Sequence, residues 1–139
     1  DLQKELHKTI VFITHDLDEA LRIGDQISIL RDGAVIQDGN PQDIIMRPAD
    51  DYISDFIKDI NRGRVIKVAT LMTRTKRAVG PKFEATTLLE DVLTTLNKSK
   101  TDAGSVVDDK GKVVGKITMK DAIMAMARPQ RAQTGARYK

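Results

Sequence analysis

The sequence predicts an α/β unit followed by a small α+β module. Three observations lead to this prediction: an apolar run of strand length near the N-terminus, a change in charge pattern near residue 62, and a second series of strand and helix patterns beyond that point. The chain has 139 residues, of which 40% are hydrophobic and 31% are charged. This composition is typical of a globular chain that is long enough for one ordinary domain or two small ones.

The first predicted element is a strand of a parallel sheet. Residues 9–14 form a nearly continuous apolar run, as expected for a strand that is covered on both faces. Asp16 and Glu19 follow with the spacing of a helix capping box, and Gly24 stands where that helix should end. The predicted order is therefore a buried strand, a polar turn and a helix.

A β-hairpin and a further helix complete the first half. The dipeptide Asp32-Gly33 between the apolar stretches 26–30 and 34–37 is a strong hairpin signal. An Asn-Pro pair at 40–41 has the arrangement of an N-cap followed by proline at the first helical position. Pro48 is expected to end that helix.

The charge pattern predicts a boundary at residue 62. Residues 62–83 contain no acidic side chain. Their basic residues are Arg62, Arg64, Lys67, Arg74, Lys76, Arg77 and Lys82. We therefore predict that residues 1–61 and 62–128 form two units. Residues 129–139 are expected to be a mobile basic tail.

The second half carries its own alternation of helices and strands. Thr87 and Glu90 have capping-box spacing at the start of an amphipathic helix. Residues 105–117 read as a hairpin with a longer loop, because two apolar stretches flank a polar turn. Thr118 can cap a last helix over residues 119–127.

Composition also excludes several classes of site. The chain contains no Cys, so disulfides and thiolate metal sites are ruled out, and no other metal site is predicted. A formal charge of +3, without aromatic platforms beside the basic residues, does not predict nucleic-acid binding. No apolar run approaches the roughly 20 residues of a transmembrane helix. Because residues 1–5 lack a signal-peptide pattern and a first Met, we expect the sequence to start within a longer protein or to be trimmed.

His15 is the first candidate functional residue. It stands at the carboxyl end of the predicted 9–14 strand, where ligands bind in open α/β sheets. Its imidazole could hydrogen-bond a phosphate or orient water there. A lone histidine at such a position is more often a capping or packing residue, so the residue by itself favours the structural role.

The longer sequence around His15 resembles the switch-histidine region of the ATPase subunits of ABC importers. The likeness begins with TIVFITHDLDEALRIGD at 9–25, passes through the Asp32-Gly33 hairpin and continues to PADDY at 48–52. The resemblance implies that residues 1–61 are the C-terminal part of an ABC-type nucleotide-binding domain. It also implies that His15 is the switch histidine, which contacts the γ-phosphate of ATP.

Three other motifs of that family do not occur in these 139 residues. They are the Gly-x-x-x-x-Gly-Lys-Ser/Thr phosphate loop, the Leu-Ser-Gly-Gly signature, and the apolar strand ending in Asp-Glu that serves Mg²⁺ and the attacking water. In the family all three lie upstream of the switch histidine. We therefore expect the chain to be a fragment of a subunit that uses ATP and Mg²⁺, and to be inactive as an ATPase on its own.

The sequence GKITMKD at 115–121, with the hairpin before it and the helix after it, resembles a CBS domain, a family named after cystathionine β-synthase. The likeness extends over residues 64–128. In that family the pattern Gly-x-x-Thr/Ser-x-x-Asp binds adenine nucleotides, which implies that Asp121 takes the ribose hydroxyls and Thr118 a phosphate. Thr-x-x-Asp is also an ordinary helix N-cap, so a purely structural role stays open. CBS domains normally work in pairs, which implies a second CBS module as a partner.

The combination of both resemblances is similar to the glycine betaine/proline betaine group of osmoprotectant importers. It implies a second ATPase subunit and a membrane permease as partners, and a peripheral location on the cytoplasmic face of the cell's inner membrane. The alternative is a stand-alone CBS-type module that senses a nucleotide or docks a partner and has no role in transport. In that case residues 1–61 serve only as scaffold.

The basic segment 62–82 allows two interpretations. Basic residues near an anionic lipid surface gain about 1 kcal/mol each. Salt screens this attraction over about 8 Å, so a lipid contact would respond to ionic strength. The more common role of such a charge run is a solvated linker, and the pattern alone favours it.

Overall fold

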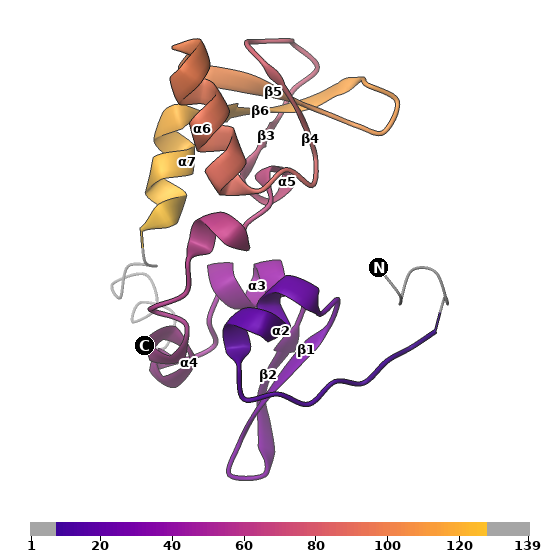
Figure 1. The fold of residues 1–139 in the computed structure, drawn as a ribbon, viewed down its shortest axis with the longest axis vertical. Coiled ribbons are helices and arrows are strands. Elements are labelled where there is room, and N and C mark those ends of the chain that lie inside the picture. The colour runs from indigo at the N-terminus through magenta and orange to yellow at the C-terminus, as the bar shows by residue number, and fades with distance from the viewer. Residues whose placement is uncertain (1–7, 128–139) are drawn as a thin grey trace.

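The computed structural model describes residues 8–127, and these residues form a lower and an upper region in the orientation of Figure 1. The lower region holds α2 (Leu17–Ile23), β1 (Ile27–Arg31), β2 (Ala34–Gly39), α3 (Pro41–Met46) and α4 (Asp51–Phe56). The upper region holds the 3-10 turn η1 (Arg62–Arg64), α5 (Val68–Leu71), β3 (Thr73–Arg74), β4 (Lys82–Glu84), α6 (Leu89–Ser99), β5 (Ala103–Val107), β6 (Val113–Thr118) and α7 (Met119–Met126). The mixed α and β content agrees with the predicted fold class. The predicted tail 129–139 lies outside the described residues.

Local sequence signals determine most of the lower region. The Asp16 side chain accepts a hydrogen bond from the Glu19 amide at 3.1 Å and caps α2, as predicted. Asp32 and Gly33 adopt left-handed φ angles of 51° and 80°, which gives the turn that matches the twist of β1 and β2. Asn40 caps α3 by accepting from the Asp43 amide at 2.9 Å.

The predicted strand at residues 9–14 is wrong. These residues run in an extended path without strand pairing, and Val11 and Ile13 are 85% and 91% exposed. A parallel strand forms only beside partner strands that satisfy its amides and carbonyls. Neither sheet of the described residues, β1–β2 or β3–β6–β5–β4, includes this segment.

The upper region is built on a four-stranded mixed sheet. β4 and β5 run parallel and are joined by α6, whereas β5 and β6 form the predicted antiparallel hairpin. Parallel neighbours need a crossover connection, and α6 supplies it. α6 and α7 lie side by side against the sheet (Figure 1). α7 begins after Thr118, whose hydroxyl accepts from the Asp121 amide at 3.1 Å, as predicted.

The predicted capping box at the start of α6 is wrong. The helix is capped by Leu88, which makes no side-chain hydrogen bond. The backbone of the preceding segment takes the place of a polar cap, because the Leu89 amide of the first turn donates to the Ile66 carbonyl at 2.9 Å. The Val68 amide donates to the Thr87 carbonyl at 2.8 Å and holds the same two segments together. These pairings fix the start of α6 at Leu89 and make the Thr87 hydroxyl unnecessary as a cap.

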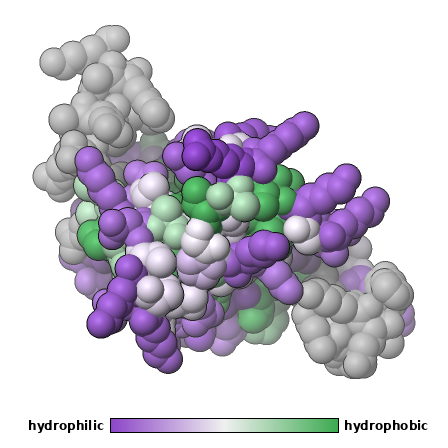
Figure 2. Space-filling view, turned by 90° about the horizontal axis from the view of Figure 1, so that it is seen from above, coloured by the Kyte–Doolittle hydropathy of each residue, from purple (hydrophilic) through white to green (hydrophobic). Residues whose placement is uncertain are grey.

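A continuous cluster of buried apolar residues extends through both regions. Its fully buried members include Ile44, Ile45, Ile53, Ile66, Val68, Leu89, Val92, Leu96, Val106 and Ile117. Seen from the end formed by the upper region, hydrophobic residues occupy the centre of the face and hydrophilic side chains surround them (Figure 2). Within residues 8–127, no helix is long and apolar enough to cross a membrane.

Candidate functional site

His15 lies at the junction between the extended N-terminal segment and α2. The turn around it is fixed by short polar contacts, because the Asp16 amide donates to the Thr14 hydroxyl at 3.0 Å while the Asp16 carboxylate caps α2. The His15 side chain is exposed. The sequence therefore predicts its position before a helix correctly, but the buried strand expected in front of it is not formed. An exposed imidazole in this place can donate to or accept from a phosphate that approaches it.

Thr118 and Asp121 lie at the first turn of α7. The Thr118 hydroxyl is already engaged as the N-cap, so the structural role that the sequence left open is present. A hydroxyl that accepts one hydrogen bond still has its own proton to donate, and this leaves Thr118 able to contact a ligand as well. The Asp121 carboxylate is exposed to solvent.

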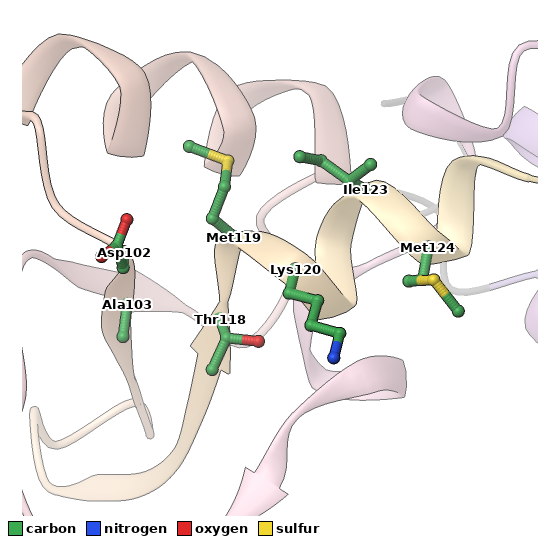
Figure 3. Close-up of a pocket in the computed structure, with 7 residues that line it drawn as sticks. All are labelled: Asp102, Ala103, Thr118, Met119, Lys120, Ile123 and Met124. Carbon is green, nitrogen blue, oxygen red and sulfur yellow. The ribbon is translucent and has the colours of Figure 1, made fainter.

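A shallow pocket opens beside these residues (Figure 3). It is lined by Asp102, Ala103, Thr118, Met119, Lys120, Ile123 and Met124. Its volume of about 550 Å³ falls within the roughly 300–1,000 Å³ that small-molecule sites occupy. The pocket includes Thr118 but not Asp121. Most of its lining surface is apolar, and its two charged residues are Asp102 and Lys120, whose carboxylate and ammonium group could contact a ribose and a phosphate.

Sequence reasoning missed Asp102 and Lys120 as candidates. Lys120 lies between Thr118 and Asp121, the two residues of the CBS-like pattern. Its position in the first turn of α7 was the sequence signal that could have identified it as a candidate. Asp102 stands 16 residues before Thr118 and precedes β5, and only the pairing of β5 with β6 brings the two together. The Met119 amide donates to the Asp102 carbonyl at 2.7 Å, which holds this corner of the pocket.

The basic segment is less uniform than its sequence indicates. Arg62 is buried, with 8% of its surface exposed, and burial lowers the pKa of its guanidinium. Arg64 forms an ion pair of 3.7 Å with Glu90. The interpretation of all of 62–82 as an exposed run is therefore wrong for Arg62. The exposed cations of the segment that form no ion pair among the described residues are Lys67, Arg74, Lys76, Arg77 and Lys82.

A metal site was not predicted, and the described residues hold no group of three or more His, Asp or Glu side chains that could bind a metal ion. The two candidate sites are thus a histidine before α2 and a pocket beside α7. Each contains groups that can contact phosphate or ribose.

Three curated proteins illustrate the relatives of this chain. It is 54% identical over 74 residues to the glycine betaine/carnitine transport ATP-binding protein GbuA of Listeria monocytogenes. These 74 residues are 53% of the chain and 19% of that protein. It is 40% identical to the trimethylamine N-oxide transport system ATP-binding protein TmoW of Pelagibacter ubique, over 84% of the chain and 34% of that protein. It is 34% identical to the glycine betaine/proline betaine transport system ATP-binding protein ProV of Escherichia coli, over 93% of the chain and 32% of that protein.

Several solved structures that resemble the chain are described as CBS domains. One is the CBS domain of the bacterial CNNM/CorC family Mg²⁺ transporter, with a TM-score of 0.35 and 14% identity over 77% of the chain and 57% of that structure. Another is a CBS-domain pair with bound AMP from Klebsiella pneumoniae, with a TM-score of 0.31 and 19% identity over 82% of the chain and 84% of that structure.

No protein-family model matches the chain. The relation to the curated proteins is nonetheless consistent, because the three relatives cover between 53% and 93% of the chain and are all transport ATP-binding proteins. The chain spans at most about a third of the length of these relatives. By sequence, the chain belongs to the family of transport ATP-binding proteins that these relatives represent.

Proposed function

We propose that the chain is part of the ATP-hydrolysing subunit that powers import of glycine betaine and related quaternary amines, and that residues 62–128 form its CBS-type regulatory module. The observation that carries this proposal is the 54% identity over 74 residues to a glycine betaine/carnitine transport ATP-binding protein. In the proposed subunit, His15 contacts the γ-phosphate of ATP. The phosphate loop and the Mg²⁺ ligands come from sequence outside this chain.

The proposed partners follow from that assignment. A second ATPase subunit would complete the nucleotide site, and a membrane permease would carry the substrate. The subunit would lie on the cytoplasmic face of the membrane. The exposed apolar side chains of residues 9–14 support a larger assembly, because a run such as Ile10, Val11 and Ile13 is normally covered by neighbouring structure.

The experiment that tests the proposal is ATP-driven uptake in proteoliposomes that contain the complete subunit and its permease. We expect uptake of labelled glycine betaine, with competition by proline betaine or carnitine and none by an uncharged sugar of similar size. Absence of uptake with every quaternary amine, in a complex that hydrolyses ATP, would contradict the proposed substrate class. A complete subunit that neither hydrolyses ATP nor supports uptake would favour the stand-alone sensing or docking module.

The same proteoliposomes test the lipid contact. Arg74, Lys76, Arg77 and Lys82 are exposed and could approach anionic headgroups, whereas Arg62 could not. If these cations bind lipid, raising the internal salt concentration should change uptake only in vesicles that contain anionic lipid, because salt screens the attraction. Equal responses in neutral and anionic vesicles would identify the segment as a solvated linker.

We further propose that the pocket beside α7 takes an adenine nucleotide, with Thr118 and Lys120 near the phosphate and Asp102 or Asp121 near the ribose. The volume of about 550 Å³ and the two charged lining residues support this assignment. A second CBS module, from another chain or from the rest of the subunit, would cover the open side.

Calorimetric titration with ATP and AMP gives the specific prediction for this pocket. Lys120→Gln should weaken binding about tenfold, because it removes a charged phosphate contact that is worth more than 1 kcal/mol. Thr118→Ala should both weaken binding and lower the free energy of unfolding by about 1 kcal/mol, since it also removes the cap of α7. Lys98→Gln, on the exposed end of α6, is the matched control and should change neither. Absence of heat for wild-type protein, also when a partner CBS module is supplied, would leave Thr118 and Asp121 with a structural role alone.

A further inference from the structure

The contact between the lower and upper regions is organised around the buried side chain of Arg62. Its Nε donates to the Ala125 carbonyl at 2.7 Å, and its Nη1 donates to the Ile45 carbonyl at 3.0 Å. Its Nη2 lies 3.7 Å from the sulfur of Met46. Within residues 8–127, the partners of this cation are thus carbonyls and a thioether, and none of the ion pairs involves it.

The two carbonyls belong to the last turns of two different helices. Ile45 is in α3 of the lower region, and Ala125 is in α7 of the upper region. The last four carbonyls of a helix have no partner within the helix, so they need donors from elsewhere. A guanidinium carries five donors in a rigid fork, and a single Arg62 can therefore cap both helix ends at a fixed separation.

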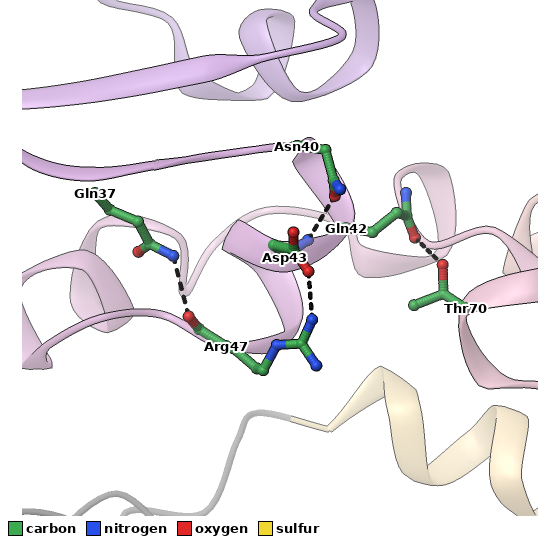
Figure 4. A network of polar contacts seen from close by, with 6 residues as sticks. All are labelled: Gln37, Asn40, Gln42, Asp43, Arg47 and Thr70. Atoms are coloured by element: carbon green, nitrogen blue, oxygen red, sulfur yellow. Dashed lines mark hydrogen bonds and ion pairs between the residues drawn. The ribbon is translucent and has the colours of Figure 1, made fainter.

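Gln42 makes a second connection between the regions from the first turn of α3. Its amide nitrogen donates to the Val65 carbonyl at 2.8 Å. Its carbonyl oxygen accepts from the Lys67 amide at 3.0 Å and from the Thr70 hydroxyl at 2.7 Å, the latter contact being drawn in Figure 4. α3 is therefore held to the upper region at both of its ends, by Gln42 at the start and by Arg62 at the end.

This geometry makes an independent movement of α7 costly. If the last turn of α7 moved away, the Arg62 guanidinium would keep its charge, since arginine does not deprotonate in proteins. It would then be buried with one acceptor fewer, and the Ala125 carbonyl would lose its donor. Both changes are unfavourable in a region that is shielded from water. Motion of the two helices together with Arg62 keeps the hydrogen bonds of its guanidinium to both carbonyls.

We propose that Arg62 couples α7 to α3, so that a shift or loosening of the helix beside the pocket is transmitted to the last turn of α3 in the lower region. Arg62 is a positioning residue in this role and touches no ligand. The inference deepens the regulation proposed for the CBS-type module, but its test requires neither transport nor a nucleotide.

Hydrogen exchange measured by mass spectrometry on the 139-residue chain tests the coupling. Thr118→Ala removes the N-cap of α7 at the end opposite Arg62, and should speed exchange in peptides from α7 about fivefold. In the wild-type background, peptides covering Pro41–Met46 should respond in the same direction by about twofold or more. With Arg62→Met, Thr118→Ala should still affect α7 but should leave α3 unchanged.

Controls separate coupling from general loss of stability. Arg64→Met removes a cation from the same turn that pairs with Glu90 on the surface, and in that background α3 should still respond to Thr118→Ala. Arg62→Lys keeps the positive charge but not the planar guanidinium fork. It replaces Arg62→Met in the experiment if that variant does not fold, and it should reduce the response of α3 to Thr118→Ala. The proposal is overturned if α3 fails to respond to Thr118→Ala in the wild-type background, and this measurement requires no Arg62 variant. It is also overturned if α3 responds equally with and without the guanidinium.

Discussion

Replacing His15 by alanine in the complete subunit is expected to lower ATP turnover about 100-fold, the loss typical for removal of one group that stabilises developing charge. ATP affinity should stay within about twofold of the wild-type value, because a contact made chiefly in the transition state affects rate more than ground-state binding. The exposed position of His15 before α2 supports this expectation, since the imidazole contributes little to the packing of this chain. Steady-state hydrolysis and nucleotide titration measure the two quantities.

The controls for this prediction come from the same segment. Lys8→Ala changes an exposed residue of the extended N-terminal stretch and should leave turnover unchanged. The 139-residue chain alone should show no hydrolysis above its His15→Ala variant, since phosphoryl transfer requires the phosphate loop and Mg²⁺ ligands that its sequence lacks. Wild-type turnover in the complete His15→Ala subunit would assign His15 to a structural role.

Features set by neighbours in the sequence were predictable. Asp16, Asn40 and Thr118 each cap the helix that follows them, because a cap needs only a short polar side chain and an amide three residues later. The turn at Asp32-Gly33 is local for the same reason, since its left-handed backbone is encoded by the two residues themselves. These signals located α2, the turn between β1 and β2, α3 and α7 along the chain.

Features that depend on distant partners were not predictable. The apolar run 9–14 has the composition of a buried strand, but a strand is made by its neighbours in the sheet, and the described residues provide none. Arg62 looked like one more cation of a basic segment. Its burial depends on carbonyls that lie 17 and 63 residues away along the chain, and no pattern around position 62 encodes them.

The candidate sites divide in the same way. The identity of His15 and Thr118 as candidates follows from motifs of contiguous residues. The pocket beside α7 forms where the start of β5 pairs with the end of β6. This pairing adds Asp102 to the lining, whereas Asp121 stays outside it. The motif thus located the start of α7 correctly, whereas tertiary structure determines which side chains line the pocket.

Among single substitutions that add one methyl group in the upper region, Gly80→Ala should be the most destabilising. Gly80 has a φ of +55°, and a Cβ placed there would lie 2.0 Å from the Ala103 carbonyl oxygen. That oxygen belongs to the first residue of β5, so relief of the clash must move backbone rather than a flexible side chain. Overpacking costs about 1–3 kcal/mol, and a left-handed backbone adds about 1–2 kcal/mol for alanine.

Gly111→Ala is the matched control, because it separates the clash from the backbone strain. Gly111 has a φ of +79°, but an added Cβ would meet no atom within 4 Å. We expect Gly111→Ala to lower the free energy of unfolding by about 1–2 kcal/mol from strain alone, and Gly80→Ala to lower it by about 2–5 kcal/mol. Urea unfolding followed by circular dichroism measures both values. If both variants lose the same free energy of unfolding, the backbone of β5 at Ala103 can move away from the added methyl group at no energetic cost. The close approach of residue 80 to this strand would then contribute nothing to the stability of the sheet.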